Sequence, residues 1–221
     1  MVKSLKFKIV YDNDAKPGFE SGWGFSCFVE LEDENILFDT GWDGNVLLSN
    51  MSRLEIDPEN IDKVVLSHAH WDHIGGLNHV LQPHMDVYLP KSFSDHMKEE
   101  ISSQVSLHEI DAPQKITDKV HTTGEIENST EEQSLIFETS KGLVVLVGCS
   151  HPGVEKILSI SSRFGSLYGI IGGLHGFDKY EVLKDLGLIV ATHCTKNDKE
   201  IKKLYPNSFI DGKVGMVFDL E

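Results

Sequence analysis

The stretch Ser67-His68-Ala69-His70-Trp71-Asp72-His73-Ile74-Gly75-Gly76 places three histidines and one aspartate within six residues, directly after the apolar run Val64-Val65-Leu66. Histidine is the commonest transition-metal ligand in proteins, and carboxylate is a usual oxygen partner. His68 and His70 are two apart and share a face of an extended segment, while Asp72 and His73 follow where the chain turns into a helix. The stretch predicts a site for one or two divalent ions, with zinc first and iron or manganese as alternatives. A surface loop of histidines with an incidental aspartate is the competing interpretation.

The composition is that of an ordinary globular protein. The chain has 221 residues, of which 40% are hydrophobic and 25% charged, and its formal net charge is -15. The length fits one large domain or two small ones, and we expect a single domain over 1–221. A chain with this negative charge repels polyanions. We therefore expect a small-molecule substrate and no nucleic acid. The oligomeric state stays open.

Neither the N-terminus nor the cysteines indicate export. The segment Met1-Val2-Lys3-Ser4-Leu5-Lys6 lacks the apolar core of a signal peptide, and no segment reaches the apolar length needed to cross a bilayer. Cys27, Cys149 and Cys194 are odd in number and scattered, which disfavours a disulfide framework. We therefore expect a cytoplasmic protein without a membrane partner.

Hydrophobic periodicity and turn residues predict alternating strands and helices. The opening strand, with apolar and basic residues in alternation, is expected at 5–11, and a hairpin at 23–31 and 35–39. Further strands are expected at 62–67, 87–89, 107–110, 115–121 and 134–139, and helices at 43–51, from Asp57-Pro58, after Gly75 and at 91–103. Residues 125–132 are acidic and polar and predict an exposed loop. Pro152 fits the first turn of one late helix, and Thr195 with Asp198 fits a capping box for another.

Three apolar strands of the second half each lead into a histidine. The histidines are His151, His175 and His193, and His68 follows a strand in the same way. Ligands bind at the carboxyl ends of strands in layered α/β proteins, so we expect these four to share one crevice. The strands that precede the three late histidines are expected at 143–147, 167–171 and 188–191.

The His-x-His-x-Asp-His motif of residues 68–73 resembles the signature of the metallo-β-lactamase superfamily. This resemblance implies an α/β fold, a four-layer αβ/βα sandwich with two packed sheets inside and helices outside. It also implies a pair of metal ions at one edge of the sheets. The ligands that it implies are His68, His70 and His151 for the first ion and Asp72, His73 and His193 for the second.

Two positions have more than one interpretation. Asp39 ends an apolar strand, where it either caps the turn before Gly41 or orients a metal-binding histidine, and the resemblance favours the second role. Most hydrolases of the superfamily have Gly-Asp, with a metal-bridging aspartate, where this chain has Gly148-Cys149. Either Cys149 supplies a thiolate, or His151 reaches in, or the second ion binds weakly. A small buried residue is the favoured interpretation of Cys149, because free cysteine is commonly buried.

Within the superfamily, the segments 148–153, 171–175 and 192–195 resemble the dihydropterin and ribofuranosylaminobenzene phosphate synthases of methanopterin biosynthesis. The stretch Trp23-Gly24-Phe25-Ser26 is also similar. The chain is short for that group between Gly76 and Glu132, a region that supplies substrate contacts. The resemblance therefore supports the metal site better than the substrate.

These features predict a metal-dependent hydrolase in which a metal-activated water attacks a small ester, lactone or phosphoester. Asp72 is the expected proton acceptor, and His175 either steadies an oxyanion or phosphate or has a structural role. Trp23 and Trp71 either form an aromatic wall for the substrate or pack in the fold. A pterin-pathway synthase and a non-catalytic metal-binding module are the alternative functions.

Overall fold

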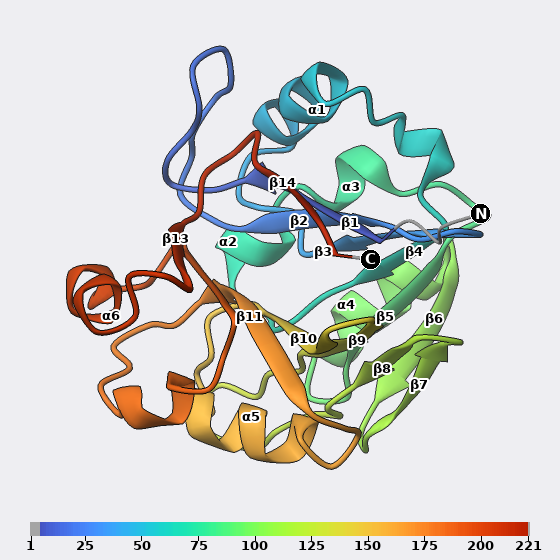
Figure 1. Ribbon diagram of the computed structural model, residues 1–221. Helices are drawn as coiled ribbons and strands as arrows, with labels where there is room; N and C mark the ends of the chain where they lie inside the picture. The colour runs from blue at the N-terminus through green and yellow to red at the C-terminus, as the bar shows by residue number, and fades with distance from the viewer. Residues whose placement is uncertain (1–4, 221) are drawn as a thin grey trace.

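The computed structural model, which describes residues 5–220, contains two seven-stranded sheets packed face to face (Figure 1). Helices cover the outer face of each sheet, so the predicted four-layer αβ/βα sandwich is confirmed. The first sheet has the order β14 (Val217–Asp219), β1 (Lys6–Tyr11), β2 (Ser26–Glu30), β3 (Asn35–Phe38), β4 (Lys63–Val65), β5 (Asp86–Pro90) and β6 (Ser106–Ile110). The second has the order β13 (Phe209–Asp211), β12 (Leu188–Thr192), β11 (Leu167–Gly173), β10 (Gly142–Val147), β9 (Leu135–Thr139), β8 (Val120–Thr122) and β7 (Gln114–Thr117).

Three clusters of buried apolar side chains hold the four layers together. The middle cluster lies between the sheets, where Phe7 of β1 packs edge-on against Phe137 of β9 with ring centroids 4.9 Å apart. The alternation of β1 explains this, because Phe7 and Ile9 point inward while Lys8 pairs with Glu30 at 2.9 Å. The two outer clusters lie beneath the helices.

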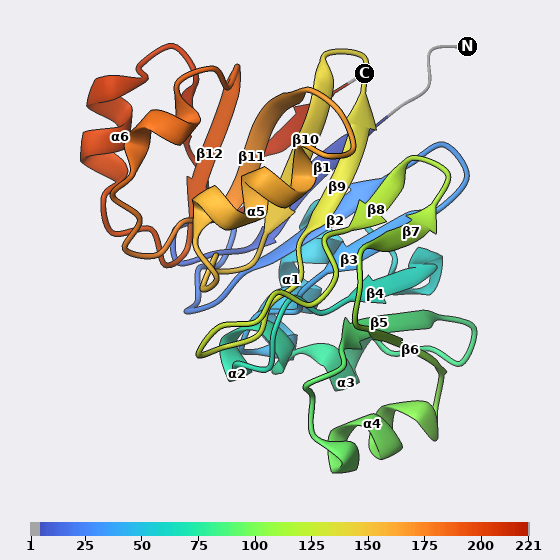
Figure 2. The same cartoon turned by 90° about the horizontal axis from the view of Figure 1, so that it is seen from below.

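The helices lie on opposite sides of the sandwich, with α1 over the first sheet and α5 over the second (Figure 2). The helix expected at 43–51 is present as α1, which starts after Asp43, and the side chain of Asp43 caps it by accepting a hydrogen bond from Asn45 N. The first sheet is covered by α1 (Gly44–Arg53), α3 (Leu77–Val80) and α4 (Asp95–Ser102), and the second by α5 (Val154–Ser161), the 3-10 turn η2 (Tyr180–Leu183) and α6 (Asp198–Leu204).

Parallel pairing brings the chemically important strand ends to one edge. Strands β3 to β6 are parallel to one another, and so are β10 to β13. The carboxyl ends of β4, β10, β11 and β12 therefore deliver His68, His151, His175 and His193 to the same edge of the sandwich, as expected from the sequence.

Four details differ from the sequence expectations. Residues 115–121 form two antiparallel strands, β7 and β8, instead of one, because the chain turns between Thr117 and Val120. Pro152 lies outside helix α5, which begins after Gly153 with φ +99°. The capping box at α6 does not form, because Thr195 Oγ1 bonds to Thr192 O and accepts from Leu174 N instead.

The fourth difference concerns the acidic segment 125–132. Its last residue, Glu132, is completely buried, and its carboxylate accepts hydrogen bonds from backbone groups of the turn after β10. The prediction of an exposed loop is therefore wrong at this position. Residues 1–4, on which the expectation of no signal peptide partly rests, lie outside the described residues. Within residues 5–220, no helix is long and apolar enough to cross a membrane.

Candidate metal centre

The first group of candidate ligands forms where β4 and β10 end. The ring centroid of His68 lies 4.6 Å from those of both His70 and His151, and the His70 and His151 rings are 4.9 Å apart. His68 Nε2 and His70 Nδ1 are 3.1 Å apart. Two nitrogen ligands that share a tetrahedral zinc ion are about 3.3 Å apart. His68 and His70 therefore have the spacing of ligands to one ion, and the ring of His151 lies beside both.

The second group lies beside the first. It contains Asp72 and His73, from the short helix α2 (Trp71–Ile74), and His193, which directly follows β12. The rings of His73 and His193 have centroids 5.1 Å apart, and His193 Nε2 is 3.2 Å from Asp72 Oδ2. The rings of His68 and His73, only 4.2 Å apart, join the two groups. The six predicted ligands thus form one continuous cluster.

Asp39 orients two of these histidines through hydrogen bonds at their Nδ1 atoms. His73 Nδ1 donates to Asp39 Oδ2 at 2.7 Å, and the Ser67 hydroxyl donates to the same oxygen at 2.7 Å. Because the Ser67 hydroxyl proton is used on Asp39, its oxygen accepts from His68 Nδ1 at 2.8 Å. Asp39 therefore holds His73 directly and His68 through Ser67, which agrees with the orienting role that the family resemblance favoured for it.

Glu132 and Asn13 anchor the other two interior histidines in the same way. His151 Nδ1 donates to Glu132 Oε2 at 3.0 Å, and His193 Nδ1 donates to Asn13 Oδ1 at 3.0 Å. With Nδ1 protonated, each ring presents an unprotonated Nε2 to the cluster. Second partners of this kind are usual for metal-binding histidine, because they fix the tautomer and the ring orientation.

One buried polar atom of the cluster lacks a hydrogen-bond partner in the described part of the chain. His193 Nε2 is buried and has no hydrogen-bond partner among residues 5–220. It lies 3.2 Å from Asp72 Oδ2, so two atoms with lone electron pairs face each other where little solvent reaches. A cation between them removes this conflict, since a buried acceptor without a partner is costly. The residues present therefore fit a bound divalent ion.

The protonation states agree with metal binding. Burial, with His193 beside it, lowers the pKa of His73 to about 3, and burial also lowers the pKa of His68. Both rings are therefore neutral near pH 7, the form that binds metal. Burial raises the pKa of Asp72, but the imidazole of His193 in contact with its carboxylate outweighs burial and holds the pKa below its usual range. Asp72 is therefore an ionised carboxylate.

Cys149 lies inside the cluster, not merely in the core. It is buried, and its Sγ is 3.2 Å from His73 Nε2. A hydrogen bond with Cys194 and burial raise the pKa of the Cys149 thiol, so it stays protonated unless a cation binds. The sequence analysis favoured a small buried residue at Cys149, and the burial is confirmed. It did not predict that the thiol lies beside the candidate ligands.

The backbone around the cluster is strained. In the described chain, the non-glycine residues with positive φ are Asp39, Glu55, Ser150, His175 and His193, and four of these five follow strands that end at the cluster. Such conformations cost on the order of 1–3 kcal/mol each and persist where the surrounding structure fixes them. The strain is therefore concentrated at the candidate site.

Three residues that were considered for contact with the substrate are exposed. His175 is exposed, with its ring centroid 5.3 Å from that of His151, so it borders the first group of ligands. Trp23 is 61% exposed, and its ring lies edge-on to His193 at 5.1 Å. Trp71, which is 70% exposed, stands between His70 and Asp72 in the sequence.

Sequence reasoning missed Glu132, Asn13 and Asp12. Asp12 Oδ1 accepts from His193 N at 2.7 Å, and burial raises its pKa to about 7. Asp12 and Asn13 directly follow β1, so the strand-end rule that found the histidines also applies to them. Glu132 has no comparable local signal.

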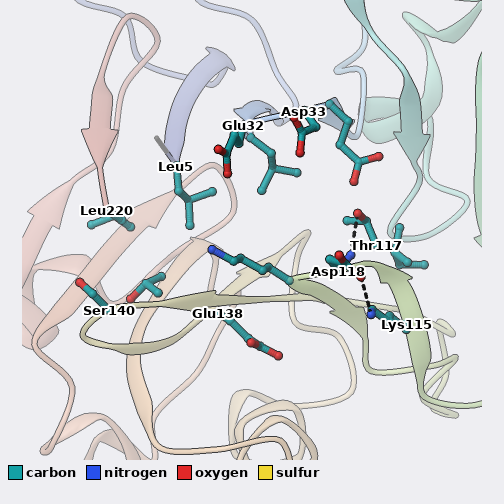
Figure 3. Close-up of a pocket in the computed structure, with 14 residues that line it drawn as sticks. Leu5, Glu32, Asp33, Lys115, Thr117, Asp118, Glu138, Ser140 and Leu220 are labelled. Atoms are coloured by element: carbon teal, nitrogen blue, oxygen red, sulfur yellow. Dashed lines mark hydrogen bonds and ion pairs between the residues drawn. The ribbon is translucent and has the colours of Figure 1, made fainter. Parts of the chain in front are cut away.

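A large cavity lies away from this cluster. It measures about 1020 Å³ and opens at the opposite edge of the sandwich, where Figure 3 shows Glu32, Asp33, Lys115, Thr117 and Asp118 around it. It is lined by the turns that precede β3 and β10, whereas the candidate ligands follow the carboxyl ends of β4, β10 and β12. Leu5 and Leu220, which also line it, border the residues that the structure does not describe. No candidate ligand lines this cavity.

The chain is similar to known proteins over most of its length. Residues 24–153 match the metallo-beta-lactamase superfamily. In Methanocaldococcus jannaschii, Uncharacterized protein MJ0448 is 28% identical over 96% of this chain and 99% of its own, and 7,8-dihydropterin-6-methyl-4-(beta-D-ribofuranosyl)-aminobenzene-5'-phosphate synthase is 29% identical over 80% and 82%. The solved structure of Tm1679, described as a metal-dependent hydrolase of the beta-lactamase superfamily, has a TM-score of 0.78 at 24% identity and covers 98% of this chain and 99% of its own.

Proposed function

The chain belongs to the metallo-β-lactamase superfamily, and from this premise we propose that it is a metal-dependent hydrolase of a small ester, lactone or phosphoester. The observation that carries the proposal is the arrangement of four histidines. Each has Nδ1 hydrogen-bonded to a fixed oxygen acceptor, directed so that Nε2 faces the cluster. Divalent ions in such a site supply Lewis acidity and a water nucleophile at neutral pH.

The proposed ligand assignment follows the two groups in the structure. One ion is held by His68, His70 and His151, and the other by Asp72, His73 and His193. Zinc is the proposed metal, because neutral imidazole and carboxylate are its usual ligands, although the same donors accept iron or manganese.

Two residues are proposed to act on the substrate. Asp72 is ionised, so its carboxylate can hold a proton released during attack by water. His175 borders the first ligand group from an exposed turn, where its ring can donate a hydrogen bond to an oxyanion or phosphate oxygen.

We expect two metal ions per chain in protein purified without added metal. His68→Ala and His193→Ala are each expected to lose one ion, because each removes a nitrogen donor from a different group. Elemental analysis against protein concentration measures this. The matched control is His96→Ala, because the His96 side chain is 83% exposed and lies on α4, and it is expected to keep both ions. Unchanged metal content in His193→Ala contradicts the second site.

The proposed substrate is a small molecule with an apolar or planar group. Trp23 supports this, because an indole that is 61% exposed beside His193 offers an apolar face at the reaction site. The net charge of -15 argues against a nucleic acid. A panel of a chromogenic carboxylic ester, a lactone and a chromogenic phosphodiester tests the reaction class.

With a hydrolysed member of this panel, Trp23→Ala is expected to raise KM about fivefold to tenfold and to change kcat little. The loss of an aromatic contact weakens binding while the metal ligands stay in place, so the metal content is expected to stay at the parent level. Phe164→Ala is the control, because Phe164 follows the C-terminal end of α5 and packs against His121, away from the candidate ligands. A KM equal to that of the parent excludes Trp23 from substrate binding.

A pterin-pathway synthase is the second candidate. It is favoured by the 29% identity to the M. jannaschii synthase over 80% of this chain. A synthase of this kind condenses two organic substrates, so it shows negligible hydrolysis of every panel member and turns over only when both substrates are present. Hydrolysis of a single panel compound, abolished by His68→Ala, favours the hydrolase.

A further inference from the structure

Cys149 occupies a position common to both groups of candidate ligands. Its Sγ lies within 4.8 Å of the donor atoms of His68 and His151, and also within 4.8 Å of those of His73 and His193. Among residues 5–220, two sets of side chains have donor atoms close enough together to hold a metal ion, and Cys149 belongs to both. The sets are His68, Cys149 and His151, and His73, Cys149 and His193. A donor in this position can contact two ions at once.

The distances suit a shared sulfur ligand. Cys149 Sγ is 3.2 Å from His73 Nε2. Zn–S and Zn–N bonds of about 2.3 and 2.0–2.1 Å place sulfur and nitrogen ligands of one tetrahedral ion about 3.6 Å apart. A small adjustment of the side chains therefore admits the ion. A thiol–imidazole hydrogen bond also accounts for the contact with His73, but not for the position of Sγ within 4.8 Å of the donor atoms of His68 and His151.

The backbone holds Cys149 in place from both sides. Cys149 N and Ser150 N donate to Glu132 Oε1 at 3.0 and 2.9 Å. A side chain at Gly148 is excluded, because a Cβ there would lie 2.2 Å from Ser67 Oγ. Ser150, with φ +60°, then turns the chain so that His151 also faces the cluster. The strained turn after β10 thus delivers a sulfur and a nitrogen to the same place.

We propose that the Cys149 thiolate bridges the two metal ions, in the place where most hydrolases of the superfamily have an aspartate. The proposal rests on the metal centre argued above. On binding, the Cys149 thiol loses its proton to solvent and two metal–sulfur bonds form, with no change of oxidation state. A thiolate bridge makes the site softer than a carboxylate bridge, so it favours zinc over manganese.

Cobalt(II) substitution tests the bridge without reference to activity. A thiolate bound to cobalt(II) gives an intense charge-transfer absorption in the near ultraviolet, whereas nitrogen and oxygen ligands do not. We expect the parent, loaded with cobalt to two ions per chain, to show this absorption. Cys149→Asp is expected to keep two ions and lose the absorption, and Cys149→Ala to lose the absorption and to bind the second ion at least tenfold more weakly.

Two controls separate the bridge from other cysteines and from misfolding. Cys194→Ser removes the thiol that hydrogen-bonds to Cys149 O, and Cys27→Ser removes a thiol in the core between the sheets. Both are expected to keep the absorption. Cys149→Asp, which restores the usual bridging residue, keeps the test valid if Cys149→Ala does not fold, and circular dichroism checks the fold of each variant.

The outcomes distinguish this proposal from the proposed function. Two bound ions without charge-transfer absorption in the parent, or absorption that survives in Cys149→Asp and vanishes in Cys194→Ser, overturns the bridge and leaves the metal-dependent hydrolase intact. A parent that binds no metal ion overturns both. Two ions with the absorption, but no hydrolysis of any panel compound, supports the bridge and rejects the hydrolase.

Discussion

Glu132→Gln is expected to lower the free energy of unfolding by about 3–5 kcal/mol, because it breaks a buried, charged hydrogen-bond network. Glu132 Oε1 accepts from Cys149 N and Ser150 N, and Oε2 accepts from His151 N and His151 Nδ1. In glutamine an amide NH₂ replaces one of these oxygens and faces two donors. In a chain of this size the loss corresponds to a fall of about 6–20 °C in Tm.

The measurement is denaturation of chelator-treated protein, so that the metal does not contribute to stability. Glu127→Gln is the matched control, because Glu127 is exposed in the same acidic segment and is expected to unfold like the parent. A Glu132→Gln variant as stable as the parent shows that this network does not stabilise the fold.

The same network sets a pH dependence in metal-free protein. Burial raises the pKa of Glu132, but the hydrogen bonds from the side chain and the backbone of His151 oppose burial, and the pKa is lowered to about 2. In the unfolded chain the pKa returns to its ordinary value of 4.5. The carboxylate therefore contributes its full stability above about pH 4.5 and loses it as the pH falls towards 2, where the difference between the parent and Glu132→Gln disappears.

Asp39→Asn is expected to weaken metal binding about 10- to 100-fold, although Asp39 lies behind the proposed ligands. The new amide donates to His73 Nδ1 where the carboxylate accepted from it. His73 then carries its proton on Nε2 and no longer offers that nitrogen to a metal. His68 is disturbed as well, because its Nδ1 is held by Ser67, whose hydroxyl donates to Asp39.

Competition with a chromophoric chelator measures the loss of affinity, and ¹⁵N NMR of labelled histidine shows which nitrogen of His73 is protonated. Asp62→Asn is the control, because Asp62 accepts from Asn35 N at the far end of β3 and is expected to keep parental affinity. Parental affinity in Asp39→Asn, with His73 still protonated on Nδ1, contradicts the orienting role.

Local sequence patterns, together with the family resemblance carried by the His-x-His-x-Asp-His motif, predicted the fold and the six clustered side chains. The apolar strands, each followed by a histidine, are signals within a few residues, and the parallel pairing that unites them follows general rules of α/β architecture. The turn at Thr117 and the failed capping box at α6 show the limit of such patterns. Thr195 resembles a helix cap locally, but it bonds to Thr192 and Leu174 in the folded chain.

The residues that orient the histidines were harder to predict. Glu132 belongs to an acidic segment typical of exposed loops, and its burial depends on three amides supplied by the turn after β10. Asn13 bonds to His193, which follows β12 and lies 180 residues away in the sequence. No short window of the sequence contains both residues. Tertiary hydrogen bonds, not propensity, determine these two roles.

The pairing of the two ends of the chain has a consequence for folding kinetics. His193 is held by Asp12 and Asn13 across separations of 181 and 180 residues, and β14 completes the first sheet by pairing with β1. Contacts of such high contact order require closure of a very long loop, and they make folding slow. Until the C-terminal strand arrives, β1 is an open edge that can pair with another chain. We therefore expect the edge of the sandwich that carries the candidate ligands to assemble late in folding. Aggregation of the incompletely folded chain competes with this step.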